Sequence, residues 1–343
     1  MTNGKLRYLS PTSFIKALNC THQVKLLKVD RVFGDEEPDE QSMAMATGTA
    51  FDAMCKAALN RRFKLSDILD EEILPKNRMA IVLAQTIFDE YSKAPLAALK
   101  EEGVGYVGAD TELDLEYTDK TGKKWKSGCR GLPDLVMTDG RITDWKVNGA
   151  FSSWGAGPKE GYTRCFFKQK DMGPHIKSLG PLENVDRGWA TQTYLYARLF
   201  GHKVGAPLRA GIEQVAVTKE SDLYFASFRN EISADFQHWC ELEFHKTFEA
   251  LNGGSVERPH YHEHKCIQYR KLCNVAKFCT AYQDFQLRSL GLSGESVQSS
   301  SAVSDGRAVS VGTEGLSFLV RKRPDGVQPD CAQSPNCPPS KPS

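Results

Sequence analysis

One predicted hairpin constrains this chain more than any other feature. Two short apolar segments, residues 132–137 and 141–147, flank residues 138–140, which read Thr-Asp-Gly. This pattern predicts antiparallel strands, because a glycine readily takes the left-handed conformation that closes a three-residue loop. Asp134 in the first segment and Asp144 in the second stand among apolar neighbours. Since a buried carboxylate costs desolvation energy unless it has a partner or a function, the hairpin is the strongest candidate for chemistry.

The register of this hairpin decides whether the two acids meet. A two-residue loop would place Asp134 opposite Trp145, on the wrong face, whereas a three-residue loop places it opposite Asp144. Residues two apart in a strand share a face, so Lys146 projects beside Asp144. We predict the three-residue loop and two adjacent carboxyl groups. Two convergent carboxylates with an open position suit Mg²⁺ or Mn²⁺, which prefer oxygen ligands.

Composition excludes several classes of protein. The 343 residues are 40% hydrophobic and 25% charged, as in ordinary soluble globular proteins. A net charge of +1 excludes a globally basic nucleic-acid coat, so any nucleic-acid contact must use a local patch. No apolar run approaches the ~20 residues that span a bilayer, and no apolar leader is present. We therefore expect a cytoplasmic protein without membrane contact, whose cysteines are reduced thiols or metal ligands.

The order of predicted elements indicates an α/β or α+β domain over residues 1–285. Helices are expected from Ser10-Pro11 onward, over 47–60, over 78–102 with an interruption near Pro95, over 189–200 and over 232–251. Further strands are expected over 111–117, 125–130, 210–218 and 222–229. Residues 286–343 are rich in Ser, Gly and Pro, and we expect a disordered tail.

Three cysteines cluster after the last predicted helix, with six and then five residues between them: Cys266, Cys273 and Cys279. A zinc ion is one candidate for binding here, because three histidines that could be ligands precede the cluster at positions 260, 262 and 264. Unligated thiols are another interpretation, since a free cysteine packs well as a small hydrophobic residue.

Several motifs in order resemble the PD-(D/E)XK nuclease superfamily, within it the RecB-type exonuclease lineage that includes the AddB and CRISPR-adaptation nucleases. The resemblance spans about residues 10–280 and implies a restriction-endonuclease-like central mixed sheet flanked by helices. The matching segments are Ser10-Pro11-Thr12-Ser13-Phe14 with Cys20, Gly48-Thr49-Ala50-Phe51-Asp52, Glu112, Pro133-Asp134, Asp144-Trp145-Lys146 and Gln192-Thr193-Tyr194-Leu195-Tyr196.

The resemblance also implies a site for Mg²⁺ or Mn²⁺. Asp134, Asp144 and the backbone carbonyl of Trp145 would hold the metal. Lys146 would orient the attacking water, and a helix carrying Gln192 and Tyr196 would complete the catalytic group. The family's usual histidine ligand is replaced here by Asp52, an oxygen donor that could still bind the metal.

Iron–sulfur members of this lineage imply a further cofactor. In them one N-terminal cysteine, here Cys20, joins three C-terminal ones to hold a four-iron–four-sulfur cluster. The segment over residues 260–280 would supply Cys266, Cys273 and Cys279. The spacing departs from the family pattern, which would require a cysteine at Arg270. Zinc and free thiols therefore stay open beside the cluster.

The implied function is a metal-dependent DNA exonuclease acting in recombination, repair or end processing. Trp154, Lys168, Lys170 and Gln192 are candidate DNA contacts, because aromatic residues interleaved with cations are typical of single-strand binding. The chain has no phosphate-binding loop of an ATP motor, so a helicase or a single-strand annealing or binding protein could act with it. The alternative is a catalytically weak or inactive DNA-end-binding module with a structural metal cluster.

Overall fold

The structure is a computed structural model of the 343-residue chain. It describes residues 5–31, 43–60, 78–108, 110–149, 167–168, 176–177, 180–217, 223–253, 267–268, 271–273, 275–279, 282–283 and 285–286. These residues belong to one compact unit, Met1–Ser293. The predicted tail, residues 286–343, lies outside them except for its first residue.

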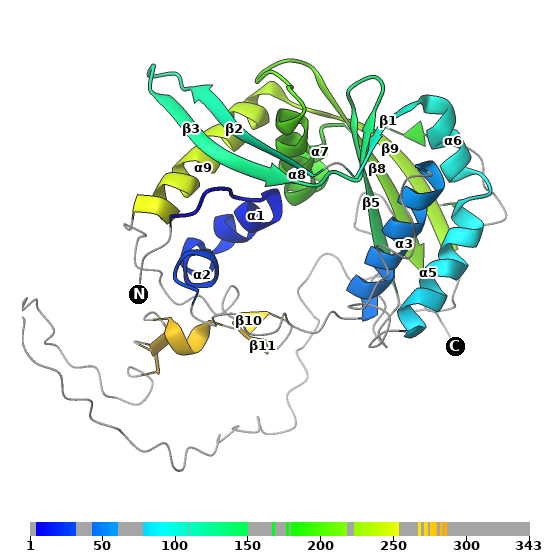
Figure 1. The fold of residues 1–343 in the computed structure, drawn as a ribbon, viewed down its shortest axis with the longest axis horizontal. Coiled ribbons are helices and arrows are strands. Elements are labelled where there is room, and N and C mark those ends of the chain that lie inside the picture. The colour runs from blue at the N-terminus through cyan, green and yellow to red at the C-terminus, as the bar shows by residue number, and fades with distance from the viewer. Residues whose placement is uncertain are drawn as a thin grey trace, which may run out of the picture. The chain divides into compact units, whose positions relative to one another are not determined.

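A mixed sheet forms the centre of this unit (Figure 1). Its strand order is β1-β4-β5-β8-β9-β6, and β7 also pairs with β9. The pairs β5–β8 and β7–β9 are parallel, and the remaining pairs are antiparallel. The strands are β1 (Val104–Val107), β4 (Leu135–Met137), β5 (Ile142–Gly149), β6 (Phe167–Lys168), β7 (Ile176–Lys177), β8 (Leu208–Val217) and β9 (Leu223–Ile232).

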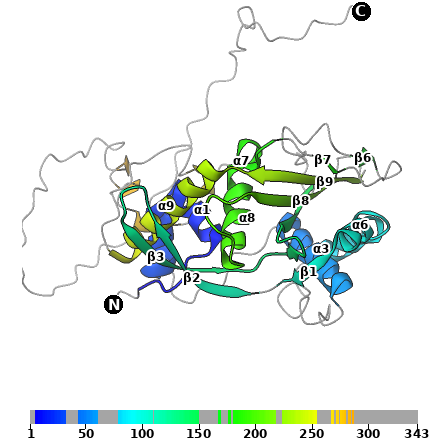
Figure 2. The same ribbon diagram turned by 90° about the horizontal axis from the view of Figure 1, so that it is seen from above.

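Helices cover both faces of the sheet, which confirms the predicted α/β class (Figures 1 and 2). One face packs against α1 (Pro11–Asn19), α8 (Arg187–Leu199) and α9 (Ala234–Gly253). The other packs against α3 (Met43–Leu59), α5 (Arg78–Tyr91) and α6 (Pro95–Glu102). Short helices follow α1 and precede α8: α2 (Thr21–Val24), η1 (Lys25–Val29) and α7 (Leu182–Val185).

Alternating side chains of the strands feed two separate hydrophobic cores. Ile142 and Ile212 enter the core beneath α8, while Trp145 and Val215 enter the core beneath α3 and α5. This follows from the two-residue period of a strand. Asp144 and Lys146 have the parity of Ile142, so they lie on the α8 face.

The predicted hairpin register is confirmed. Leu135 pairs with Thr143, and the N–H of Met137 donates to the carbonyl of Arg141 at 2.8 Å, which leaves a three-residue loop. Gly140 has a φ of 82°, the left-handed conformation expected at the end of this loop. The first strand is shorter than predicted and begins at Leu135, because Pro133 has no N–H to donate to a ladder.

The predicted start of the first helix and the predicted break near Pro95 are also confirmed. Ser10 caps α1, with its side chain accepting from the N–H of Ser13 at 3.2 Å, as expected of serine before a proline. The interruption predicted near Pro95 separates α5 from α6. The sequence did not indicate β1, a four-residue strand that pairs with β4.

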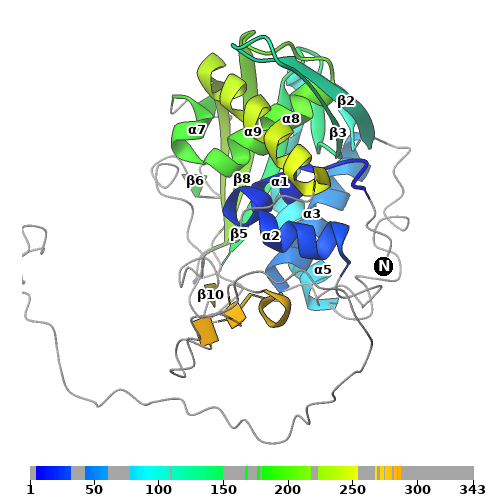
Figure 3. The same cartoon turned by 90° about the vertical axis from the view of Figure 1, so that its left-hand side faces the viewer.

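A two-stranded sheet, β2 (Thr111–Thr118) with β3 (Lys124–Gly131), packs beside α9, which the side view brings to the front with α1 and α2 (Figure 3). A second small sheet pairs β10 (Ile267–Gln268) with β11 (Lys271–Leu272), and η4 (Ala276–Phe278) follows. None of the described helices is long and apolar enough to cross a membrane.

Candidate metal and catalytic site

The two aspartates of the hairpin lie side by side on the α8 face of the sheet. Because Leu135 faces Thr143, Asp134 falls opposite Asp144 one step further along the ladder. The Asp134 carboxylate accepts the backbone N–H of Trp145 at 3.1 Å. This bond fastens the end of β4 to β5 and fixes one oxygen of Asp134. The predicted convergence of the two carboxyl groups is therefore present in the structure.

Lys146 joins this pair to helix α8. Its ammonium forms an ion pair with Asp144 and donates to the side-chain oxygen of Gln192 at 3.0 Å. The amide of Gln192 in turn donates to the hydroxyl of Tyr196 at 3.0 Å, one helical turn away. Five predicted site residues thus form one continuous polar group across three segments: Asp134, Asp144, Lys146, Gln192 and Tyr196.

Burial dominates the electrostatics of Asp144, which is 4% exposed. Desolvation raises the pKa of this carboxyl to about 6; Asp134 adds to the rise and Lys146 opposes it. Like charges this close disfavour full ionisation, and a cation bound between them would relieve the repulsion. The Tyr196 hydroxyl also has a raised pKa, caused first by burial, so it stays protonated and can donate a hydrogen bond.

Asp52, which the sequence predicts as a metal ligand, reaches this site through a lysine. Lys56 lies one turn further along α3, and its ammonium is 2.5 Å from Asp52 Oδ2 and 3.0 Å from Asp134 Oδ1. Lys56 belongs to none of the motifs that the sequence indicates. Its spacing of four from Asp52 was visible, but nothing local indicated the contact with Asp134.

Gln214 is a second residue that sequence reasoning missed. It is fully buried on β8 and pairs in register with Lys146, so both side chains share the α8 face. Neither its amide nitrogen nor its amide oxygen has a hydrogen-bond partner in the described part of the chain. A buried amide without partners is rare, and here it lies beside the acidic pair.

The donor set fits a hard divalent cation. Oδ1 of Asp52 is buried and has no hydrogen-bond partner among the described residues, and the carboxylates of Asp134 and Asp144 supply further oxygens. The described residues contain no cluster of three or more His, Cys, Asp or Glu side chains arranged to hold a metal. A metal at this place would therefore be held by no more than two of these three acids at once, together with backbone, water or substrate oxygens, as Mg²⁺ commonly is.

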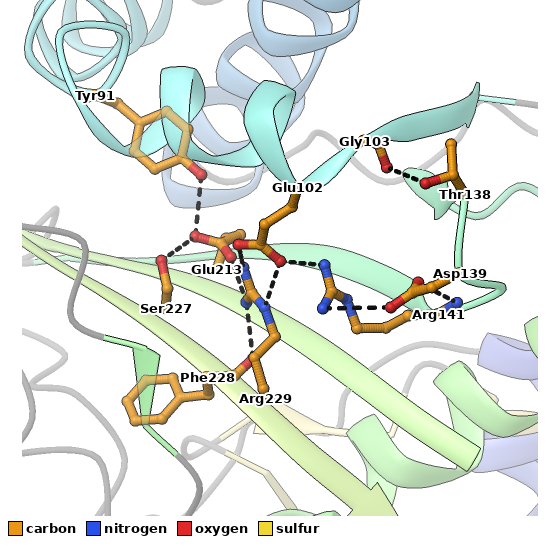
Figure 4. A network of polar contacts seen from close by, with 10 residues as sticks. All are labelled: Tyr91, Glu102, Gly103, Thr138, Asp139, Arg141, Glu213, Ser227, Phe228 and Arg229. Carbon is orange, nitrogen blue, oxygen red and sulfur yellow. Dashed lines mark hydrogen bonds and ion pairs between the residues drawn. The ribbon is translucent and has the colours of Figure 1, made fainter. Parts of the chain in front are cut away.

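A buried polar network supports β5 from the opposite face (Figure 4). The indole N–H of Trp145 donates to the Tyr91 hydroxyl at 3.0 Å, and this hydroxyl lies 3.3 Å from Glu213. Glu213 also pairs with Arg229 at 2.7 Å, and Arg229 pairs with Glu102 at 2.6 Å. Arg141 contacts the same Glu102, which ties α6 to the start of β5. These contacts tie the strand that carries the acidic site to α5, α6, β8 and β9.

Two of the four predicted cluster cysteines meet at one residue. The N–H of Gln23 donates to the sulfur of Cys20 at 3.4 Å, and the Gln23 amide donates to the sulfur of Cys273 at 3.5 Å. These cysteines stand 253 positions apart in the chain, so the fold brings them together. Cys279 follows η4, and Cys266 lies outside the described residues.

The predicted DNA contacts are mostly outside the described part of the chain. Trp154 and Lys170 fall there, and Lys168 is described only by its backbone in β6. Gln192 lies in the polar group described above. Glu112, a further motif match, is on the β2–β3 sheet, where its carboxylate is 3.3 Å from Arg130.

Comparison with known proteins finds a distant structural similarity and no sequence match. No protein-family model matches the chain, and no curated protein matches it. Among solved structures, it is similar to the crystal structure of a protein from Eubacterium rectale called a putative exonuclease. The two share 14% sequence identity with a TM-score of 0.47, over 73% of this chain and 83% of that one.

Proposed function

We propose that this protein is a metal-dependent nuclease that hydrolyses phosphodiester bonds in DNA. The observation that supports it best is the polar group built from Asp134, Asp144 and Lys146 with Gln192 and Tyr196. It joins two acids, which can hold a divalent cation, to a lysine that can stabilise negative charge. Both acids and the lysine lie on one sheet face, held by the hydrogen bonds described above.

Asp134 and Asp144 would hold Mg²⁺ or Mn²⁺, with the carbonyl of Trp145 as a further ligand, and Asp52 is the next candidate. The metal would supply polarisation of the scissile phosphate and a lowered pKa for its bound water. Lys146 is placed by Asp144 and Gln192, so its ammonium can orient a water and stabilise charge that develops on phosphate oxygens. Tyr196 fixes Gln192, and Gln214, beside Lys146, offers two polar atoms that have no hydrogen-bond partner among the described residues.

Cleavage of end-labelled DNA tests this proposal. Wild-type protein, purified anaerobically, would be incubated with single- and double-stranded DNA and Mg²⁺ or Mn²⁺, beside Lys146→Ala. We expect the wild type to degrade DNA and the variant to lose at least about a hundredfold in rate, since Lys146 acts on developing charge. Lys126→Ala is the matched control, because Lys126 is an exposed β3 lysine that also pairs with carboxylates. No cleavage with either metal would refute the nuclease.

The finer assignments rest on the family resemblance. We propose an exonuclease that takes DNA with a free end, in recombination, repair or end processing, alongside a helicase or a single-strand annealing or binding protein. A ladder of fragments that shortens from one labelled end would support it, whereas internal cuts in circular DNA would contradict it. The protein is proposed to act in the cytoplasm.

A DNA-end-binding module without cleavage is the second candidate. It is favoured by one observation: Lys56 and Lys146 already pair with all three acids of the site. Protein that binds DNA ends at low salt, yet never cleaves with either metal, would select this candidate.

An iron–sulfur cluster is proposed for the cysteine site, because Cys20 and Cys273 both contact Gln23. Four thiolates are the usual ligand set of such a cluster, and the other two would come from Cys266 and Cys279. Anaerobically purified protein should then absorb visible light and contain iron. Protein that contains zinc without iron would favour a zinc site. Protein that contains neither metal would indicate free thiols.

A further inference from the structure

Lys56 is unusual among the lysines that the structure describes because it is buried and has two acidic partners. Its side chain is 7% exposed, and its neighbours along α3 are apolar: Ala53, Met54 and Cys55 are all buried. A lysine in such surroundings ordinarily loses its proton. Here its ammonium forms ion pairs with Asp52 at 2.5 Å and with Asp134 at 3.0 Å. Lys56 is therefore a cation inside the site, held between two acids.

The position of the Lys56 ammonium affects which carboxylate oxygens a metal could bind. Asp134 uses one oxygen for Lys56 at 3.0 Å and the other for the N–H of Trp145 at 3.1 Å. Both oxygens of the acid that faces Asp144 are thus engaged before a metal arrives. The three acids of the site carry three negative charges, and Lys56 and Lys146 cancel two of them when all are ionised.

We propose that Lys56 is a resident cation of the metal site: it positions Asp134 and competes with the divalent ion for the charge of Asp52 and Asp134. The proposal rests on the metal site proposed above. It assigns a role to Asp52, because Asp52 is one of the two acids that form ion pairs with Lys56. Lys56 acts through the carboxylates and is a positioning residue.

A purely structural role for Lys56 gives a different expectation. If Lys56 only fastens α3 to β4, its removal lowers stability and loosens Asp134, so metal affinity falls or stays the same. If Lys56 competes with the metal, its removal takes a positive charge away from a divalent ion at short range in a buried site. Coulomb repulsion there is strong, so metal affinity rises. The sign of the change in affinity separates the two roles.

The experiment is a titration of the full-length protein with Mn²⁺ alone, followed by electron paramagnetic resonance of free Mn²⁺ at a pH of about 8. In Lys56→Gln, an amide can still donate to the carboxylates while the charge is removed. We expect Mn²⁺ to bind about tenfold more tightly, or better, than to wild type, as loss of repulsion at short range requires. Unchanged or weaker binding would overturn the proposal.

Three variants make the result decisive. Lys93→Met removes an exposed lysine of the turn between α5 and α6 that pairs with Glu90 at 2.6 Å, and it should bind Mn²⁺ like wild type. Asp144→Asn should bind Mn²⁺ at least about tenfold more weakly, because a metal-bound carboxylate is lost. If Asp144→Asn binds like wild type, the metal site and with it the proposed nuclease are wrong. If Asp144→Asn binds more weakly as expected but Lys56→Gln binds like wild type, the proposed role of Lys56 alone is wrong.

Melting temperatures give a readout that does not depend on activity. In EDTA, Lys56→Gln should melt below wild type, because two acids lose their partner. Saturating Mn²⁺ should raise its melting temperature more than that of wild type, since the metal replaces the lost cation. If Lys56→Gln fails to fold, Lys56→Met keeps the test: it removes the charge with a side chain of similar length, and it should again bind Mn²⁺ about tenfold more tightly than wild type. Unchanged or weaker binding by Lys56→Met would overturn the proposal.

Discussion

Replacing Asp144 by asparagine should stabilise the metal-free protein, by an amount that grows with pH. Asp144 is 4% exposed on the α8 face of β5. Burial, as the largest effect, and Asp134 raise its pKa from 3.8 to about 6, against the opposing effect of Lys146. The folded protein therefore binds a proton at this carboxyl more tightly than the unfolded chain does.

The sign follows from this difference in proton binding. A carboxyl with a raised folded pKa favours folding most below its unfolded pKa, and that contribution is lost as pH rises through its folded pKa. Each pKa unit corresponds to about 1.4 kcal/mol, so a rise of about two units costs about 3 kcal/mol above a pH of about 6. At a pH of about 4.5 the cost is only about 1 kcal/mol. An asparagine cannot ionise and avoids this cost.

Urea unfolding in EDTA, at pH values of about 4.5 and 7.5, measures the effect. The free energy of unfolding of Asp144→Asn, relative to wild type, should rise by about 2 kcal/mol between the two values. Any constant effect of the amide cancels in this comparison. Asp114→Asn is the control, because Asp114 is 53% exposed on β2 and should show no such rise. A difference that stays constant or shrinks as pH rises would refute the reasoning.

Three further predictions concern the supports of the site. Glu213→Gln should lower the free energy of unfolding in urea by about 1–3 kcal/mol, because Arg229 loses one of its two acidic partners; an unchanged value would contradict the role given to the network. Gln192→Ala should lower kcat of DNA cleavage by about 10- to 100-fold with little change in KM, since Lys146 loses an anchor; a change in KM alone would argue for DNA binding instead. Cys273→Ser should abolish visible absorbance, whereas the buried Cys129→Ser should keep it; equal spectra would exclude Cys273 as a ligand.

The hairpin was predictable because its determinants are local. Turn residues select the loop length, and the two-residue period then decides which side chains share a face. The register between Leu135 and Thr143 follows from those two rules. The caps and breaks of the helices were predictable for the same reason, since serine and proline act on their own segment.

The parts of the site that could not be predicted from the sequence depend on contacts between distant segments. Lys56 meets Asp134 across 78 positions, and Arg229 meets Glu102 across 127 positions. Gln214 lies beside Lys146 only because β8 runs parallel to β5 in one register. A crossover connection of this kind brings its strands together through tertiary packing, which no periodicity within either strand specifies.

The alternation of side chains along β5 also limits how this region of the gene can change. Asp144 and Lys146 enter the acidic site, while Trp145 enters the apolar core behind it. An insertion or deletion of one codon within β5 would exchange the two sets, placing charges in the core and an indole among the acids. Length changes should therefore be tolerated in the exposed turn between β2 and β3, and rejected throughout Ile142–Gly149. In a deep-sequencing screen of single-codon deletions, we expect the surviving variants to include no deletion within β5.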